Sequence, residues 1–227
     1  MDSEPLQLRR LGRRPYVPVW EAMRAHTAAR GSETPDALWL VEHEPVYTLG
    51  RNAATEHLLD AGEIPVVAVD RGGQITYHGP GQVLAYVLLD LRRRGWAVRG
   101  LVEALEQGVI DLLAEHEVVG ARRPGAPGVY VDGAKVAALG LRVRRGCTYH
   151  GLALNVDMDL APFARINPCG FVGLPVTQLS ALGVRLDAEA AASSLARHLR
   201  RRLDRPTFRG AAAPAGTEIP TMEADPR

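Results

Sequence analysis

The chain has 227 residues and 46% of them are hydrophobic, which is enough to bury one sizeable core. Its net charge is +1 and only 5% of its residues are aromatic, so it lacks the positive excess and the stacking groups of a nucleic-acid-binding protein. Two cysteines do not make a disulfide framework, and no stretch has the ~20 apolar residues of a membrane span or the apolar region of a secretory signal. We therefore expect a cytoplasmic protein with reduced thiols that contacts neither nucleic acid nor a membrane.

Apolar periodicity and turn residues predict the secondary structure. In chain order, the expected elements are an edge strand at residues 6–11, a helix at 16–30, a strand at 37–43, β-rich segments at 64–69 and 83–91 (the latter a central strand), a helix at 98–116, a hairpin at 129–136, a strand at 148–156 and a helix from Asp187 to about residue 203. The clearest helical stripe lies in residues 98–116. Asp132-Gly133 between alternating apolar residues is a strong hairpin signal, and Asp187 can cap the last helix.

This mixture of antiparallel strands with a few helices predicts an α+β fold. No linker-like stretch interrupts residues 6–204, so we expect a single domain over residues 1–205. Residues 206–227 consist largely of Ala, Pro, Gly and Thr, with almost no large apolar residue, which predicts a disordered tail.

Nearly all basic residues are arginines, and they occur in clusters such as residues 92–94, 142–145 and 200–202. One interpretation is that each cluster is a solvated face. The other is that some of them form a docking surface for an acidic protein.

Three segments are richer in glycine and polar residues than simple connections need to be. The first, RGGQITYHGPGQ (residues 71–82), lies between two expected strands and is either an elaborate β-turn or a binding loop. The second carries Lys135 among small apolar neighbours, whose desolvating effect would lower its pKa and let it act as a base, although strand lysines commonly point to solvent. The third places Cys169 between Pro168 and Gly170 on a tight turn that suits a nucleophile.

Cys147 is a competing thiol, because it also lies in an expected turn, with His150 three residues later. Cys147, His150, Cys169 and His78 could be counted as zinc ligands, but no close pair of cysteines or histidines supports that count. We therefore expect no metal and no cofactor.

Four motifs, in their order and spacing, resemble the lipoyl(octanoyl) transferases: EHEPVYTLGR (residues 42–51), RGGQITYHGPGQ (71–82), DGAKVAALGLRVRRGCTYHGLALNV (132–156) and INPCGF (166–171). The resemblance covers roughly residues 38–182. It implies the fold of the catalytic domains of biotin and lipoate protein ligases, a mixed β-sheet with packed helices. It also implies transfer of octanoate from octanoyl-acyl carrier protein to a lysine of lipoyl domains, in the E2 subunits of 2-oxoacid dehydrogenases and in the glycine cleavage H protein.

The same resemblance assigns roles to individual residues. Cys169 would hold the acyl group as a thioester, Lys135 would favour the thiolate and move protons, and His150 would support the site. The residues implied to line the acyl pocket and the thioester site are Arg71, Gly72, Gly73, Gln74, Ile75, Thr76, Tyr77, His78, Ala138, Leu139, Gly140, Gly151, Leu152 and Ala153.

The alternative enzyme is an ATP-dependent lipoate or biotin ligase of the same fold, which forms an acyl-adenylate. Such a ligase would not need Cys169, and residues 71–82 lack the longer glycine run of lipoate ligases. A catalytically silent acyl- or protein-binding module would need neither Cys169 nor Lys135, and neither cysteine has a protease-like signature. The transferase is therefore the predicted function.

Overall fold

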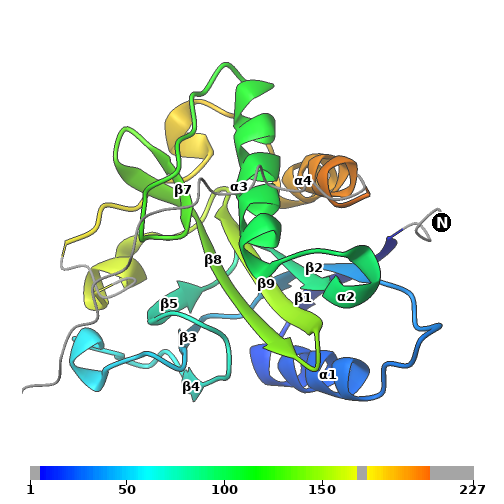
Figure 1. Cartoon of the computed structure of the whole chain (residues 1–227). Coiled ribbons are helices and arrows are strands. Elements are labelled where there is room, and N and C mark those ends of the chain that lie inside the picture. The colour runs from blue at the N-terminus through cyan, green and yellow to red at the C-terminus, as the bar shows by residue number, and fades with distance from the viewer. Residues whose placement is uncertain (1–5, 168–172, 205–227) are drawn as a thin grey trace, which may run out of the picture.

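The computed structural model describes residues 6–167 and 173–204, which build two β-sheets and the helices packed against them (Figure 1). Among these residues, the larger sheet has six strands in the order β1-β2-β6-β9-β8-β7. β1 and β2 run parallel and the other neighbours antiparallel, so the sheet is mixed. Its strands are β1 (Gln7–Arg14), β2 (Ala37–His43), β6 (Gln82–Leu88), β7 (Gly128–Val131), β8 (Ala134–Arg144) and β9 (Cys147–Asn155).

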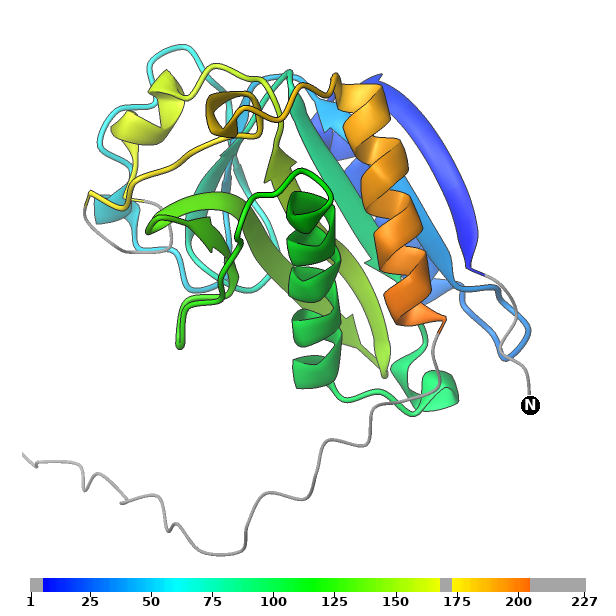
Figure 2. The ribbon, with the colours of Figure 1, turned by 90° about the horizontal axis from the view of Figure 1, so that it is seen from above.

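Helices cover both faces of this sheet. On one face α3 (Val98–Ala114) and α4 (Ala188–Leu203) lie side by side, as Figures 1 and 2 show, and bury a large aliphatic core that includes Leu105 and Leu195. On the other face α1 (Tyr16–Ala28) packs Met23 against residues of β2, β6 and β9. In the described ranges, the shorter helices are α2 (Leu91–Arg94) and the 3₁₀ turns at Thr55–His57, Ala161–Arg165 and Ser180–Leu182.

A second, three-stranded sheet in the order β4-β3-β5 lies on the α1 side of the large sheet (Figure 1). Its strands are β3 (Val46–Leu49), β4 (Val66–Ala68) and β5 (Ile75–His78). The sequence did not predict β3, and it placed residues 75–78 in a connection rather than a strand. β5 is only four residues long and follows two glycines, so neither an apolar run nor an alternation is long enough to reveal it.

The predicted α+β class is confirmed, and most predicted elements lie within a few residues of their expected bounds. Asp132 and Gly133 both have positive φ, 48° and 81°, which is the two-residue turn that joins β7 to β8. The Asp187 side chain accepts a hydrogen bond from the backbone N–H of Ala190 at 2.7 Å and so caps α4 as expected. β1 lies at the sheet edge and β6 inside the sheet, again as predicted.

The disordered tail expected at the C-terminal end remains a prediction. The expected tail at residues 206–227 lies outside the described residues. Within the described ranges, no helix combines the length and the apolar character needed to cross a membrane.

A buried cluster of charges around Asp36 ties several elements together. The Asp36 carboxylate accepts hydrogen bonds from Arg30, Arg93 and Arg94 and from the backbone N–H of Asp90. Burial alone would raise the pKa of Asp36, but these donors outweigh it and hold the pKa below its usual range. Arg94 also donates to the carbonyl of Leu203 at 2.7 Å, so the cluster reaches the end of α4. Part of the arginine cluster at residues 92–94 therefore stabilises the fold, instead of facing solvent or a partner.

Asp36→Ala should lower the free energy of unfolding by about 3–5 kcal/mol, because it leaves the buried Arg30 and Arg94 without their counter-charge. Glu103→Ala is the matched control, because Glu103 pairs with the exposed Arg99 one helical turn away. This substitution should lower the free energy of unfolding by less than about 0.5 kcal/mol. Denaturant unfolding at pH 7 measures both. Equal losses in the two variants would contradict this account of the cluster.

Candidate functional site

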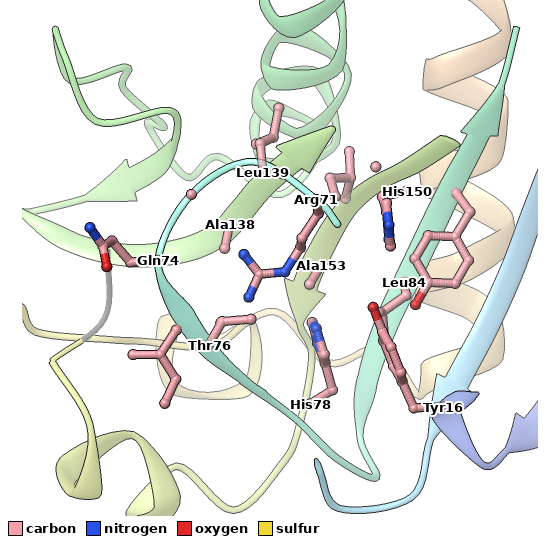
Figure 3. Close-up of a pocket in the computed structure, with 16 residues that line it drawn as sticks. Tyr16, Arg71, Gln74, Thr76, His78, Leu84, Ala138, Leu139, His150 and Ala153 are labelled. Atoms are coloured by element: carbon pink, nitrogen blue, oxygen red, sulfur yellow. The ribbon is translucent and has the colours of Figure 1, made fainter. Parts of the chain in front are cut away.

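The main pocket lies between the face of the large sheet and the segment that leads from β4 into β5 (Figure 3). About 510 Å³ of space, a volume that includes open solvent, lies between the residues that line it. The floor comes from β6, β9 and β8 and the roof from residues 71–76. The lining residues are Tyr16, Arg71, Gly73, Gln74, Ile75, Thr76, His78, Leu84, Tyr86, Ala138, Leu139, Gly140, His150, Gly151, Leu152 and Ala153.

The residues that were predicted to form a pocket are brought together here, with two exceptions. Gly72 lies in the roof but donates its N–H to the carbonyl of Leu141 at 2.9 Å. Tyr77 points to the other face of β5, where it packs against Tyr47 and Phe163. The exception at Tyr77 follows from strand geometry, since successive side chains of β5 face opposite sides.

Tyr16, Leu84 and Tyr86 also line the pocket and were not predicted. Tyr16 opens a helix and the other two lie in a strand that reads as ordinary core. An apolar run shows that a strand is buried, but it does not show which of its faces borders a cavity. Only the packing of α1 and the small sheet onto this face could reveal them.

Arg71 fixes the roof to the small sheet. Its guanidinium is buried and donates to the carbonyl oxygen of Thr48 at 2.7 Å and to the hydroxyl of Thr48 at 2.9 Å. Gly50 and Gly73 pass so closely that a Cβ on Gly50 would lie 2.2 Å from the carbonyl oxygen of Gly73. Glycine at position 50 is therefore required for the roof to approach β3.

Asp70 fixes the other side of the roof. Its carboxylate accepts hydrogen bonds from the indole of Trp20 and from His150, both at 2.9 Å, and from the hydroxyl of Tyr149. Burial would raise the pKa of Asp70, but these three donors prevail and hold it well below its usual range. Since Trp20 belongs to α1 and Tyr149 and His150 belong to β9, one carboxylate joins the roof, a helix and the sheet.

Two buried histidines at one end of the pocket are held neutral. His43 donates from Nδ1 to the carbonyl oxygen of Arg14 at 2.8 Å, so its Nε2 must accept from the hydroxyl of Tyr86 at 2.7 Å. His78 contacts the side-chain oxygen of Gln82 through Nδ1 at 2.7 Å. Burial lowers the pKa of His43 to about 4 and that of His78 to about 3.

Lys135 lies in a second hollow, which shares Thr76 and Ala138 with the main pocket. Its side chain is buried, unlike that of most strand lysines, and Nζ lies 3.3 Å from the carbonyl oxygen of Pro127 and 5.1 Å from the centre of the Tyr130 ring. The small apolar neighbours of Lys135 thus correctly indicated that its side chain is buried.

The two cysteines differ in what the structure says of them. Cys169 lies outside the described residues. Cys147 was expected in a turn, and this prediction is wrong. It is the first residue of β9 and follows the Arg145-Gly146 turn. It is buried, and burial is the main cause that raises the pKa of its thiol, which disfavours the thiolate. Within the described part of the chain, no three His, Cys, Asp or Glu side chains gather closely enough to hold a metal ion.

Comparison with known proteins places the chain in one family. The lipoyl protein ligase A/B catalytic domain family matches residues 15–200. An octanoyltransferase of Thiobacillus denitrificans is 62% identical over 202 residues, which cover 88% of this chain and 93% of the relative. An octanoyltransferase of Azoarcus sp. (strain BH72) is 62% identical over 203 residues, which cover 88% and 89%.

Solved structures share the fold at much lower identity. A lipoate-protein ligase A bound with ATP superposes with a TM-score of 0.72 at 14% identity, covering 88% of this chain and 85% of the other. A biotin protein ligase from Aquifex aeolicus gives 0.55 at 13% identity, covering 87% and 70%. The predicted likeness to the catalytic domains of these ligases is confirmed.

Acid should weaken the protein before its carboxylates titrate. The unfolded chain binds protons at histidine near pH 6.5, whereas folded His43 and His78 resist protonation until about pH 4 and about pH 3. Below pH 6.5 the unfolded state therefore binds more protons, and each histidine should lower the free energy of unfolding by about 2 kcal/mol between pH 7 and pH 5. Denaturant titrations at the two pH values measure this, with His43→Gln removing about half of the change. Equal stability at pH 5 and pH 7 would contradict the neutral assignment.

Proposed function

Because this chain belongs to the lipoyl protein ligase A/B catalytic domain family, among its octanoyltransferases, we propose that it moves octanoate from octanoyl-acyl carrier protein to a lipoyl-domain lysine through a thioester on Cys169. The expected acceptors are the lipoyl domains of 2-oxoacid dehydrogenase E2 subunits and the glycine cleavage H protein. The observation that carries this proposal is the buried Lys135 at the end of an apolar pocket.

The backbone around Lys135 supports a role for the segment that carries Cys169. Lys135 donates its N–H to the carbonyl oxygen of Pro175 at 2.8 Å and accepts from the N–H of Thr177 at 2.9 Å. On the other side of that segment, Asn167 donates its N–H to the carbonyl oxygen of His57 at 2.8 Å. Leu174 borders the hollow that holds Lys135. Pro175 and Thr177, which follow Cys169 in the sequence, are therefore hydrogen-bonded directly to Lys135 of β8.

The first half-reaction exchanges one thioester for another. The thiolate of Cys169 attacks the carbonyl carbon of the donor, and the bond from that carbon to the carrier's sulfur breaks. The carrier leaves as a thiol that takes its proton from the Lys135 ammonium, which leaves Lys135 neutral. The ammonium of Lys135 favours the thiolate form of Cys169, because opposite charges attract in a site from which water is largely excluded. Since bonds of the same type form and break, this step needs no ATP.

The second half-reaction makes the amide. The amine of the acceptor lysine attacks the Cys169 thioester, neutral Lys135 takes the proton of that amine, and the bond from the carbonyl carbon to Cys169 breaks. Backbone N–H groups near Cys169, or the N–H of Gly73 in the roof, can donate hydrogen bonds to the oxyanion that forms in each step, whereas the N–H of Gly72 is already bound to Leu141. Conversion of a thioester into an amide is downhill and drives the cycle forward.

The ATP-dependent ligase remains the second candidate, because the fold is shared with a lipoate-protein ligase that binds ATP. That likeness at 14% identity concerns the fold alone. Relatives at 62% identity over nearly their whole length are octanoyltransferases, which favours direct transfer.

Octanoyl-acyl carrier protein alone, without ATP or magnesium, should leave a hydroxylamine-sensitive octanoyl group on the peptide that contains Cys169. Cys169→Ala should abolish both the label and transfer to a lipoyl domain. Cys147→Ala, at the buried thiol, is the control and should keep both. Intact mass and peptide mapping provide the measurement. A label on Cys147 would overturn the nucleophile assignment, and an absolute requirement for ATP would favour the ligase.

The role of Lys135 can be separated into charge and proton transfer. Lys135→Ala should slow alkylation of Cys169 at pH 7 about tenfold, with recovery at higher pH, because the cation that favours the thiolate is gone. Lys135→Arg should keep fast alkylation but transfer octanoate poorly, since arginine holds its proton. The readout is the pH profile of alkylation by a small reagent in a Cys147→Ala background. Three superimposable profiles would show that Lys135 does not govern the thiol.

A further inference from the structure

The floor of the main pocket changes in height from strand to strand. In the register of the sheet, residues of β6, β9 and β8 lie directly opposite one another. Two rows cross the pocket floor, and each has a large side chain on β6 and small residues on the other two strands. The rows are Leu84–Ala153–Ala138 and Tyr86–Gly151–Gly140.

The small residues form a trough and the large ones a ledge at its end. Ala138 belongs to both the main pocket and the hollow of Lys135, so the trough opens toward the lysine. Figure 3 shows Gln74, Thr76 and Ala138 toward that end of the pocket, and Tyr16, Leu84 and His150 toward the opposite end. An acyl chain that enters the pocket beside Lys135 would cross β8 and β9 and then contact β6.

The length of this trough matches a medium acyl chain. Neighbouring strands are ~4.8 Å apart, so the path from β8 to β6 is roughly 10 Å. A fully extended chain advances about 3.5 Å over three covalent bonds, so the seven C–C bonds of an octanoyl chain span roughly 8 Å. Two further methylene groups would bring the end of the chain against β6.

Hydrogen bonds hold the ledge in place. The hydroxyl of Tyr86 donates a hydrogen bond to His43, and the other ring nitrogen of His43 donates to the backbone carbonyl of Arg14. The Tyr86 ring therefore cannot turn away from the pocket without leaving a buried polar group unpaired. The ring of Tyr16 packs against the ring of His43, with 4.9 Å between the ring centres. Leu84 is buried against residues such as Met23 of α1. The ledge cannot readily yield to a longer ligand.

We propose that Leu84 and Tyr86 are specificity-determining residues that stop the acyl chain and set its preferred length. This inference rests on the proposed function, because it takes the acyl carbonyl to lie at the Lys135 end. It assigns the length limit to the β6 side of the sheet rather than to the roof segment.

Two substitutions at cross-strand neighbours should move the preference in opposite directions. Leu84→Ala lengthens the trough, so the ratio of kcat/KM for decanoyl to octanoyl donors should rise about tenfold, the effect of burying two more methylene groups. Ala153→Val fills the trough, so the ratio of octanoyl to hexanoyl should fall by about tenfold. Loss of stability alone would lower all rates together and would leave these ratios unchanged.

Leu40→Ala is the matched control, because Leu40 is equally buried in the neighbouring strand β2 but faces the α3 and α4 core. It should leave the chain-length profile of the wild type. The assay measures transfer from hexanoyl-, octanoyl- and decanoyl-acyl carrier proteins to a lipoyl domain in all four proteins. If the wild type transfers none of the donors, the proposed function fails. If it transfers octanoate but all four proteins share one length profile, only the ledge is overturned.

Discussion

The pocket depends on one close approach of backbone to backbone. The roof segment lies against β3 through Gly50 and Gly73 and against β8 through the hydrogen bond from Gly72 to Leu141. A side chain at position 50 would overlap the carbonyl of Gly73, so the roof would have to lift from the sheet. On the side of the large sheet, a Cβ on Gly140 of β8 would lie 3.0 Å from the carbonyl oxygen of Gly72, so glycine also lets the roof lie close to that sheet.

A second constraint is that several buried polar groups around the pocket are bound to protein partners. The buried His43 and His78 each have one nitrogen committed to a fixed acceptor, which decides their tautomers. Asp70 accepts from three donors that belong to α1 and β9. Satisfied buried networks hold one arrangement, since any movement exposes a donor or acceptor to an apolar surrounding. His43, His78 and Asp70 therefore need no hydrogen-bond partner from a ligand, and an apolar ligand can bind beside them.

Sequence patterns predicted the elements whose signal is local. The Asp132-Gly133 turn and the Asp187 cap depend on neighbouring residues only, and both are observed. The apolar neighbours of Lys135 correctly indicated its burial. Strands β3 and β5 of the small sheet were missed because four residues are too few to show an apolar run or an alternation. The tyrosines at positions 16 and 86 were missed because their exposure to the pocket arises from tertiary packing. The motif resemblance identified most of the pocket lining without this information, whereas the role of Cys169 remains a prediction.

The charges around Asp36 give the protein a particular response to heat. The cost of removing charged groups from water falls as temperature rises, whereas the stabilisation from each unit of buried apolar area levels off. Arg30 and Arg94 are almost completely enclosed, so most of that cost applies to them. The ion pairs that join the start of β2, the short α2 helix and the end of α4 should accordingly stabilise the fold more, relative to the apolar contacts, at high temperature than at low temperature. Fraying on heating should begin elsewhere in the molecule, at parts held by apolar contacts alone.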